Sequence, residues 1–340
     1  MISINMLSRA DMVKGQGVLS AYNEQVNLVK EEFTDEFKVL ENKLKLCEIM
    51  HFHTINPEFF FMIPFAKRKG KAVGYVHFLP ETLEKSIHLP VILKKIFYKY
   101  VITFYKSMDY LVTVNPYFID VLENYGVDRN KVTYIPNFVD SKSFYPLDCV
   151  EVSELRQKYK LDSSKFTVLC VGQLQKRKGI FDFIDIAKRM PEVQFIWAGN
   201  FAFGKISDGY EEIKKILDNV PENVCFLGLI DRNKMNEVYN MSDVMFLPSY
   251  EELFPMTVLE SMNVGLPILL RDIDLYKNIL FDFYLKGREN GEFIEIIKKL
   301  KTDKDFYNSA CERSFEGHQF YSKEHVSRMW KEFYSRVKAN

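Results

Sequence analysis

The sequence predicts an α/β protein of two domains, each a doubly wound parallel sheet covered by helices. The chain has 340 residues, about twice the length of a typical domain of about 150 residues. Short runs rich in β-branched and aromatic residues alternate with segments of helical periodicity. This alternation begins again after a polar stretch at residues 136–148. Since parallel strands need long crossover connections, usually helices, each half is expected to form its own sheet.

The composition is that of an ordinary globular chain. Hydrophobic residues make up 47% and charged residues 27%, too apolar for a disordered protein. Lys plus Arg and Asp plus Glu are both 46, giving a net charge of zero. A chain without excess positive charge has no global attraction to nucleic acid, so no nucleic-acid partner is expected.

The cysteines and the first fifteen residues indicate the cellular compartment in which the protein is expected. The five cysteines are scattered, with no CxxC pair and no metal-ligand spacing, which favours free thiols in a reducing, cytoplasmic environment. Arg9, Asp11 and Lys14 interrupt the first fifteen residues, so a signal peptide is not expected. Lysines also break the apolar stretches well short of the roughly 20 residues that span a bilayer.

Five strands are expected in each half. Those of the first half are residues 2–7, 44–52, 72–78, 110–114 and 132–135. Those of the second half are residues 166–171, 193–198, 224–227, 244–247 and 267–270. Asn115 with Pro116 indicates one helix start, and Asp231 precedes a polar helix running to Asn240. After Gly291 only helices are expected. The first domain is assigned to residues 1–145 and the second to 146–314, followed by a helical tail at 315–340.

Residues 248–267 carry the most informative chemistry. A strand runs into a loop that holds Glu252, and Pro255 starts a helix with Glu260 on its second turn. The helix start offers unpaired N–H groups and a positive dipole end, which suit a phosphate. Glu260 could accept two hydrogen bonds from a vicinal diol such as ribose. In open α/β sheets, ligands bind beyond the carboxyl ends of strands, so we expect a ligand in a cleft between the two domains.

Three further segments could contribute to such a site. Residues 171–179 form a strand end and a basic loop with Arg177 and Lys178, although such a loop by itself is more simply a solvated one. Gly15 and Gly17 follow the first strand, where glycine lets the backbone approach a phosphate. His77 ends another strand and is a candidate polar contact. His51 and His53 are interpreted as structural histidines.

These motifs resemble those of the retaining glycosyltransferases with the GT-B fold, in the group numbered four. Two glutamates with seven residues between them mark that family, matched here by Glu252 and Glu260 and followed by a Gly-Leu-Pro turn at residues 265–267. Residues 134–140 resemble the family's crossing between domains, with Phe138 in place of glycine. Gln173 stands where the family has an arginine, so Lys176 or Arg177 would supply that charge.

The resemblance implies a GT-B enzyme that binds a UDP-sugar and needs no metal or other cofactor. It implies catalytic roles for His77, Lys178 and Glu252, with His77 and Glu252 near the donor sugar. The residues it implies for donor binding are Gly15, Gly17, Arg177, Lys178, Phe254, Met256, Thr257 and Glu260. It also implies front-face attack at the sugar carbon, with the leaving phosphate as base, and a tail at 315–340 that returns to the first domain.

A basic region at residues 61–107 indicates the kind of acceptor. Its nine Lys or Arg outnumber two Glu, and its lysines are mixed with aliphatic and aromatic residues. This composition is typical of a helix in an anionic membrane interface, but also of a core helix with a solvated lysine edge. The motifs near residues 4–17 resemble those of bacterial enzymes that add a second hexose to glucosyl-diacylglycerol.

We therefore expect a hexosyltransferase, using UDP-galactose and a glycolipid acceptor, peripheral on the cytoplasmic face of the cell membrane. The alternatives are a transferase of capsule or other cell-wall polysaccharide synthesis, or a catalytically silent sugar-nucleotide-binding protein. The donor hexose, linkage and oligomeric state do not follow from the sequence.

Overall fold

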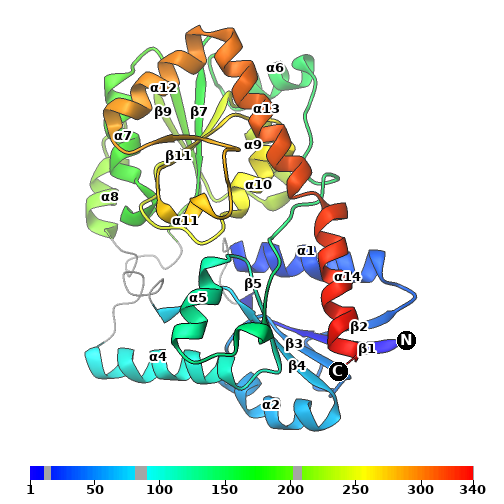
Figure 1. Ribbon diagram of the computed structural model, residues 1–340. Helices are drawn as coiled ribbons and strands as arrows, with labels where there is room; N and C mark the ends of the chain where they lie inside the picture. Colours follow the sequence, from blue (N-terminus) through cyan, green and yellow to red (C-terminus); the bar gives the residue numbers. More distant parts are fainter. Residues whose placement is uncertain (11–16, 81–89, 202–208, 340) are drawn as a thin grey trace. The chain divides into compact units, whose positions relative to one another are not determined.

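The computed structural model describes residues 1–10, 17–80, 90–201 and 209–339. Figure 1 traces the chain, which divides into two compact units. Unit 1 contains Met1–Phe138 and Lys323–Asn340, and unit 2 contains Val139–Ser322. The domain boundaries expected from the sequence were 145/146 and 314/315, whereas the units meet at 138/139 and 322/323.

Unit 1 is built on a six-stranded parallel sheet. In spatial order its strands are β2 (Phe37–Glu41), β1 (Ile2–Leu7), β3 (Ile49–Phe52), β4 (Lys71–Val76), β5 (Tyr110–Thr113) and β6 (Val132–Tyr134). The chain first moves from β1 to β2 and then reverses to run from β3 to β6. The order therefore reverses between β1 and β3, where open α/β sheets form a crevice.

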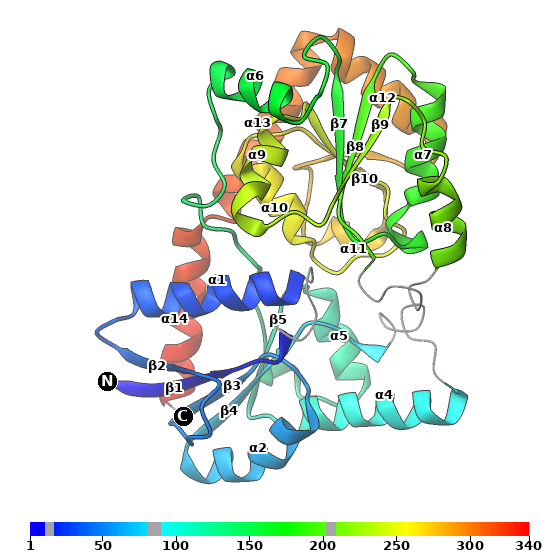
Figure 2. The ribbon, with the colours of Figure 1, turned by 180° about the vertical axis from the view of Figure 1, so that it is seen from behind.

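Helices cover both faces of this sheet. They are α1 (Gly17–Glu32), α2 (Pro57–Lys69), α4 (Val91–Lys106), α5 (Tyr117–Asn124) and α14 (Lys323–Ala339). Figures 1 and 2 show α1 and α14 on one face and α2 and α4 on the other. For α1, α2 and α4 this division follows from right-handed crossovers, because the chain moves in opposite directions on the two sides of the switch point. Trp330 of α14 is buried at 1% exposure.

Unit 2 repeats the plan with a second six-stranded parallel sheet. In spatial order its strands are β12 (Leu285–Gly287), β11 (Ile268–Arg271), β10 (Val244–Leu247), β7 (Thr167–Val171), β8 (Gln194–Ala198) and β9 (Val224–Gly228). The order reverses between β7 and β10, which pair at Val244 and Val168. The core lies on these strands, since β7, β8, β10 and β11 are buried throughout.

The helices of unit 2 also divide between two faces. They are α6 (Cys149–Lys158), α7 (Ile180–Arg189), α8 (Tyr210–Leu217), α9 (Met235–Asn240), α10 (Met256–Asn263), α11 (Asp274–Lys277), α12 (Asn290–Thr302) and α13 (Lys304–Phe320). Short 3₁₀ turns cover Lys176–Lys178 and Arg232–Lys234 in this unit and Arg129–Lys131 in unit 1. Figures 1 and 2 show α7, α8 and α12 on one face and α9, α10 and α13 on the other.

The structure adds to each sheet one edge strand that the sequence did not indicate, and the expected edge strands β6 and β9 are reproduced to within one residue. β2 and β12 were not expected, and both lie at an edge. Edge strands are short and keep polar side chains outside, so their patterns are weak. β2 has one buried residue in five, and Lys286 in the middle of β12 is exposed. Residues 44–48 are not part of β3, and Leu44 is 97% exposed.

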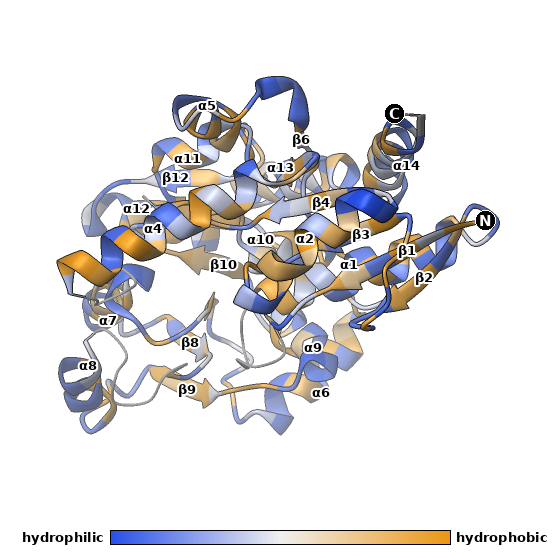
Figure 3. Cartoon of the chain, turned by 90° about the horizontal axis from the view of Figure 1, so that it is seen from below, coloured by the Kyte–Doolittle hydropathy of each residue, from blue (hydrophilic) through white to orange (hydrophobic). Residues whose placement is uncertain are grey.

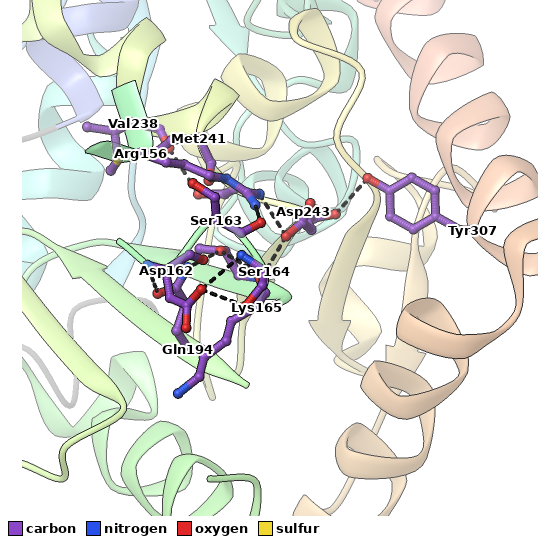
Figure 4. Close-up of polar contacts among 12 residues, drawn as sticks. Arg156, Asp162, Ser163, Ser164, Lys165, Gln194, Val238, Met241, Asp243 and Tyr307 are labelled. Carbon is purple, nitrogen blue, oxygen red and sulfur yellow. Dashed lines mark hydrogen bonds and ion pairs between the residues drawn. The ribbon is translucent and has the colours of Figure 1, made fainter. Parts of the chain in front are cut away.

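A polar network ties the amino ends of the strands in unit 2, opposite the carboxyl ends where ligands are expected (Figure 4). Asp243, just before β10, receives bonds from the Arg156 guanidinium at 2.9 Å and the Thr167 amide at 2.7 Å. The Tyr307 hydroxyl of α13 donates to the Asp243 carbonyl at 3.1 Å. Burial raises the pKa of Asp243 although Arg156 opposes this. The network joins α6, the sheet and α13, which is a structural role.

Three helix starts were expected. The one after Asp231 begins as the 3₁₀ turn Arg232–Lys234 and becomes α-helical only at Met235, and the other two are reproduced with a shift of one residue or less. α5 begins at Tyr117, whose amide donates to the Asn115 side chain at 3.0 Å. α10 begins at Met256, directly after Pro255. Among the residues that the structure describes, no helix is long and apolar enough to cross a membrane.

Candidate functional site

Lys178 and Glu252 form a buried ion pair at the switch point of unit 2. Lys178 ends the 3₁₀ turn that follows β7, and Glu252 lies in the loop that follows β10. The Lys178 ammonium donates to the Glu252 carboxylate, and the two side chains are only 13% and 7% exposed. Because β7 and β10 are adjacent parallel strands, their loops emerge side by side at the carboxyl edge of the sheet.

The pair perturbs the ionisation of both groups. Burial raises the pKa of Glu252, but the Lys178 ammonium and the Arg177 guanidinium outweigh it, and the net shift is downward. Burial lowers the pKa of Lys178 despite the opposing effect of Glu252. Glu252 is therefore held as a carboxylate. An ammonium has three donor hydrogens, so Lys178 can keep Glu252 and also donate to a phosphate oxygen.

Backbone contacts hold the two loops together. The Tyr250 amide donates to the Arg177 carbonyl at 2.8 Å, and the Arg177 guanidinium donates to the Glu251 carbonyl at 3.2 Å. Gly179, between Lys178 and α7, has φ +74°, and a Cβ there would lie 2.4 Å from the Pro248 carbonyl oxygen. Only glycine satisfies both the left-handed backbone and this close approach.

Glu260 lies on α10 and is 4% exposed. Its Oε1 accepts from the Arg232 guanidinium at 2.7 Å, and its Oε2 accepts from the Tyr239 hydroxyl at 2.5 Å. Each carboxylate oxygen has a second acceptor site, so Glu260 can still bind a diol. Sequence reasoning missed Arg232 and Tyr239. Their signal was their position at the start and near the end of the helix that was expected after Asp231 and up to Asn240.

The first turn of α10 is where a diphosphate was expected from the sequence. Pro255 precedes the helix and has no N–H, and the amides of Met256 and Thr257 have no carbonyl one turn earlier within the helix. Met256 is buried. The Phe254 ring is also buried and packs on Tyr321 at 5.3 Å. A donor contact from Phe254 would therefore involve its backbone rather than its ring.

Three further charged groups near these loops form ion pairs elsewhere. Lys176 forms an ion pair with Glu212 of α8, so Arg177 and Lys178 are the cations beside Glu252. Asp272 and Asp274 follow β11 with Asp-x-Asp spacing, and each pairs with a cation, Arg288 at 2.9 Å and Lys277 at 2.6 Å respectively. Within the described ranges, no group of three potential metal ligands is found.

His77 belongs to unit 1 and forms part of a stack of buried rings on the α1/α14 face of the sheet. The Tyr75 ring lies 4.3 Å from that of His77 and 5.2 Å from that of His53, and the rings of His53 and His51 are 4.3 Å apart. Burial lowers the pKa of His51 and of His77 to about 3, and that of His53 also falls well below its usual value. These imidazoles are neutral at physiological pH.

The histidines differ in their hydrogen bonds. His51 Nδ1 lies 3.0 Å from the Tyr334 hydroxyl, which supports its interpretation as a structural residue. The Nε2 atom of His77 and both ring nitrogens of His53 are buried without a hydrogen bond in the described part of the chain. Gly17 is the first residue of α1, and Gly15 lies outside the described residues. Their role at the donor phosphate stays a prediction.

Unit 2 thus brings Arg177, Lys178 and Glu252 together at one strand edge, with Glu260 on the helix that follows. Positive groups and a helix start suit a diphosphate, while two carboxylates suit sugar hydroxyls. Chemically, this arrangement can hold a nucleoside diphosphate sugar and stabilise charge on its departing diphosphate.

Two known families match this chain. Residues 151–314 match the family described as Glycosyl transferases group 1, and residues 38–143 match Glycosyltransferase Family 4. The chain is 44% identical over 338 residues to the alpha-galactosylglucosyldiacylglycerol synthase of Streptococcus pneumoniae, covering 99% of this chain and 90% of that protein. It is 31% identical over 236 residues to the processive diacylglycerol alpha-glucosyltransferase of Acholeplasma laidlawii, covering 69% and 70%.

Solved structures share the fold. The Anabaena protein HepE, crystallised with UDP-glucose, superposes with a TM-score of 0.78 at 15% identity, covering 99% of this chain and 100% of that one. Sucrose-phosphate synthase from Thermosynechococcus elongatus gives 0.77 at 15% identity, covering 100% of both chains. These likenesses confirm the two-domain α/β architecture expected of the GT-B fold.

Proposed function

This chain belongs to the Glycosyl transferases group 1 family, and from that premise we propose that it moves a galactosyl group from UDP-galactose to glucosyl-diacylglycerol. It is a glycosyltransferase. The single observation that carries the choice of glycolipid is the 44% identity, along almost the whole chain, to a synthase of galactosylglucosyldiacylglycerol. A diacylglycerol glucosyltransferase at 31% identity agrees on the acceptor class.

The donor site that we propose lies in unit 2. The diphosphate would contact the Lys178 ammonium, the Arg177 guanidinium and the first amides of α10, while the ribose diol would bond to Glu260. Support comes from the burial of the Lys178–Glu252 pair and from the donors that fix both oxygens of Glu260. Preorganised donors of this kind stabilise charge that develops in a transition state.

The reaction exchanges one bond at the anomeric carbon of the sugar. The bond from this carbon to the β-phosphate oxygen breaks, and a bond to the acceptor hydroxyl oxygen forms on the same face. The acceptor proton passes to the departing phosphate, which leaves as UDP. In this retaining scheme no protein nucleophile is needed, so Glu252 is assigned to a donor sugar hydroxyl. The polar contact that the sequence analysis assigned to His77 stays a prediction.

We also propose that the transfer needs no metal ion. Support comes from the chain's own cations, since Lys178 and Arg177 both act on Glu252 electrostatically and Lys178 retains donor hydrogens for a phosphate. Addition of a chelator to the transfer assay tests this directly. Unchanged turnover is expected, and a loss that Mg²⁺ or Mn²⁺ restores would contradict it.

The acceptor membrane would meet unit 1 at helices α2 and α4. These helices pack through Phe60 on α2 and the rings of Tyr100 and Phe104 on α4, at 5.7 and 6.2 Å. Figure 3 shows apolar residues along the first half of α4 and on α2. Their exposed apolar side chains are Phe61, Phe65, Val91, Ile92, Leu93 and Ile96, with exposures from 53% to 73%. We call these six residues the α2/α4 patch.

Exposed cations lie on the same two helices as the α2/α4 patch. Lys67, Arg68 and Lys69 end α2, and Lys95 and Lys99 lie along α4. Apolar groups with neighbouring cations suit an anionic interface, where a Lys or Arg near the surface adds about 1 kcal/mol. The sequence left two interpretations open for residues 61–107. The six exposed apolar side chains favour a helix at the membrane interface over a core helix.

The transfer itself is tested with a matrix of donors and acceptors. Purified protein is incubated with UDP-galactose or UDP-glucose and with glucosyl-diacylglycerol, diacylglycerol or an undecaprenyl-diphosphate sugar in mixed micelles. UDP release with UDP-galactose and glucosyl-diacylglycerol is expected. Release only with UDP-glucose would overturn the sugar, release only with the polyprenyl acceptor would overturn the glycolipid, and no release in any combination would favour a silent protein.

Membrane binding is tested by vesicle flotation. Wild-type protein is expected to float with vesicles containing anionic phosphatidylglycerol, and I92D/I96D is expected to remain at the bottom of the gradient. As a matched control, V150D introduces an aspartate at a 67% exposed apolar position of unit 2 and is expected to float normally. Equal flotation of I92D/I96D and wild type would remove the α2/α4 patch from the account.

A further inference from the structure

Arg271 is a buried cation at the carboxyl edge of unit 2 that the proposed chemistry leaves unused. It is the last residue of β11, follows three apolar residues in that strand, and is 8% exposed. A charged group in such a place requires several partners to offset its desolvation. Its partners come from three other segments of the unit.

The guanidinium contacts the loop after β10 and the start of helix α7, which follows the loop after β7. Arg271 Nε donates to the carbonyl of Pro248, the first residue after β10, at 2.9 Å. Arg271 Nη2 forms an ion pair at 3.1 Å with Asp182, in the first turn of α7. A further bond from Nη1 to the Arg288 carbonyl fixes the third side of the guanidinium.

Tyr250 completes the arrangement. The Arg271 guanidinium carbon lies 4.0 Å from the centre of the Tyr250 ring, and the Tyr250 hydroxyl donates to Asp182 at 2.8 Å. The Tyr250 amide is bonded in turn to the Arg177 carbonyl. One guanidinium therefore fixes the loop after β10 at Pro248 and Tyr250, and the start of α7 through Asp182.

These two fixed points lie close in sequence to the ion pair. Pro248 is four residues before Glu252, and Asp182 is four residues after Lys178. We propose that Arg271 is a positioning residue that keeps the Lys178–Glu252 pair in register by fixing the loop that carries Glu252 and the helix start that follows Lys178. This inference rests on the proposed donor site. It adds a residue that lies outside residues 171–179 and 248–267, the two segments that indicated that site.

Lysine cannot replace this guanidinium, because a single ammonium cannot bond to a carbonyl, pair with a carboxylate and stack on a ring in one fixed geometry. In R271K we expect kcat/KM for the UDP-sugar to fall about 10- to 100-fold, since displacement of reacting groups by about 1 Å can cost this much. The KM for the lipid acceptor should stay within about twofold of wild type. Y250F keeps the ring and should lose less than about threefold.

Arg156 provides the matched control for loss of a buried arginine. Its side chain is 12% exposed against 10% for Arg271, and it also bonds to a carbonyl and an aspartate. It lies at the amino edge of the same sheet (Figure 4). R156K is expected to lower Tm to a similar degree while donor kcat/KM stays near wild type. Equal donor kinetics in R271K and R156K would overturn the proposal.

A second measurement does not depend on transferase activity. Hydrogen–deuterium exchange is followed in peptides covering residues 173–182 and 248–255. Faster exchange in both segments is expected for R271K but not for R156K. If wild type transfers no sugar but R271K loosens these segments, the positioning role stands and the proposed function fails. If R271K leaves exchange in both segments unchanged, the positioning role fails whatever the activity.

Discussion

The Lys178 ammonium donates to the Glu252 carboxylate although the two residues are 74 positions apart in the sequence. Adjacent strands β7 and β10 bring them together, and burial of both side chains makes each depend on the other. Removal of one charge from such a pair leaves the other buried without a partner, which is strongly destabilising. Substitutions at the pair should therefore preserve shape, and each needs a folding control.

Glu252→Gln is expected to lower kcat by about 10²- to 10³-fold, the usual effect of removing one preorganised polar partner. The amide keeps the size of the side chain but cannot accept hydrogen bonds at both terminal atoms. Initial rates of UDP release at saturating donor and acceptor measure the effect. E251Q, the same change at the neighbouring residue, should stay within about threefold of wild type. Near-normal turnover of E252Q would refute an essential role for this carboxylate.

Tyr239→Phe is expected to raise the dissociation constant for UDP, because Glu260 loses the hydroxyl that fixes Oε2. The lost buried hydrogen bond should also lower the free energy of unfolding by about 1–3 kcal/mol. Isothermal titration with UDP measures the first effect, and denaturant titration the second. Y307F removes another tyrosine hydroxyl of unit 2, bonded to the Asp243 carbonyl, and should leave UDP affinity unchanged. The prediction fails if Y239F and Y307F bind UDP equally.

Three glycine substitutions should fall in a fixed order of stability. Gly291 in α12 has open space around its Cβ position, so G291A should be neutral or stabilise by up to about 1 kcal/mol. Gly265 has φ +77° and open space, so G265A costs backbone strain only. Gly179 adds a clash with Pro248, so G179A should have the lowest Tm. Only G179A should also weaken UDP binding. Any other order in thermal melts would contradict this account of the loops.

Acid should destabilise unit 1 through its buried histidines. Burial lowers the pKa of His51 and of His77 from 6.5 to about 3, so the unfolded chain binds protons that the folded chain does not. Stability is then full above pH 6.5 and is lost as pH falls toward 3, by about 1.4 kcal/mol per pH unit for each such histidine. Urea titrations between pH 7.5 and 5 measure the slope.

His53→Phe provides the control for this acid effect. The pKa of His53 is also lowered by burial, and neither ring nitrogen is hydrogen-bonded in the described part of the chain. Phenylalanine should therefore fit the stack and make the fall in stability between pH 6.5 and 5 shallower. The same slope in H53F and wild type would show that His53 does not titrate on unfolding.

The sequence was sufficient for the buried strands and for the edge strands β6 and β9, but not for the edge strands β2 and β12. β1, β7, β8 and β10 were predicted to within one residue, because strands buried on both faces leave a dense apolar signal. β2 and β12 lie at edges with solvated side chains, and only their neighbours make them strands. Residues 44–48 were wrongly predicted to be part of a strand, because an apolar residue such as Leu44 is typical of a core. Leu44 is almost fully exposed.

The sequence predicted the residues of the candidate site but not the residues that form hydrogen bonds with them. The spacing of Glu252 and Glu260 placed them around a helix start, as the structure has them. Their donors lie elsewhere in the chain: Lys178 follows β7, and Tyr239 and Arg232 follow β9. Such contacts depend on strand order, which no local pattern contains. Arg271 was missed for this reason, although a charge at the end of an apolar strand was a usable signal.

A crystal structure with bound UDP tests the central claim most directly. The account predicts the diphosphate beside Lys178, Arg177 and the first turn of α10, with the ribose hydroxyls bonded to Glu260. UDP bound in unit 1, or in unit 2 without contact to Lys178 or residues 252–260, would contradict it.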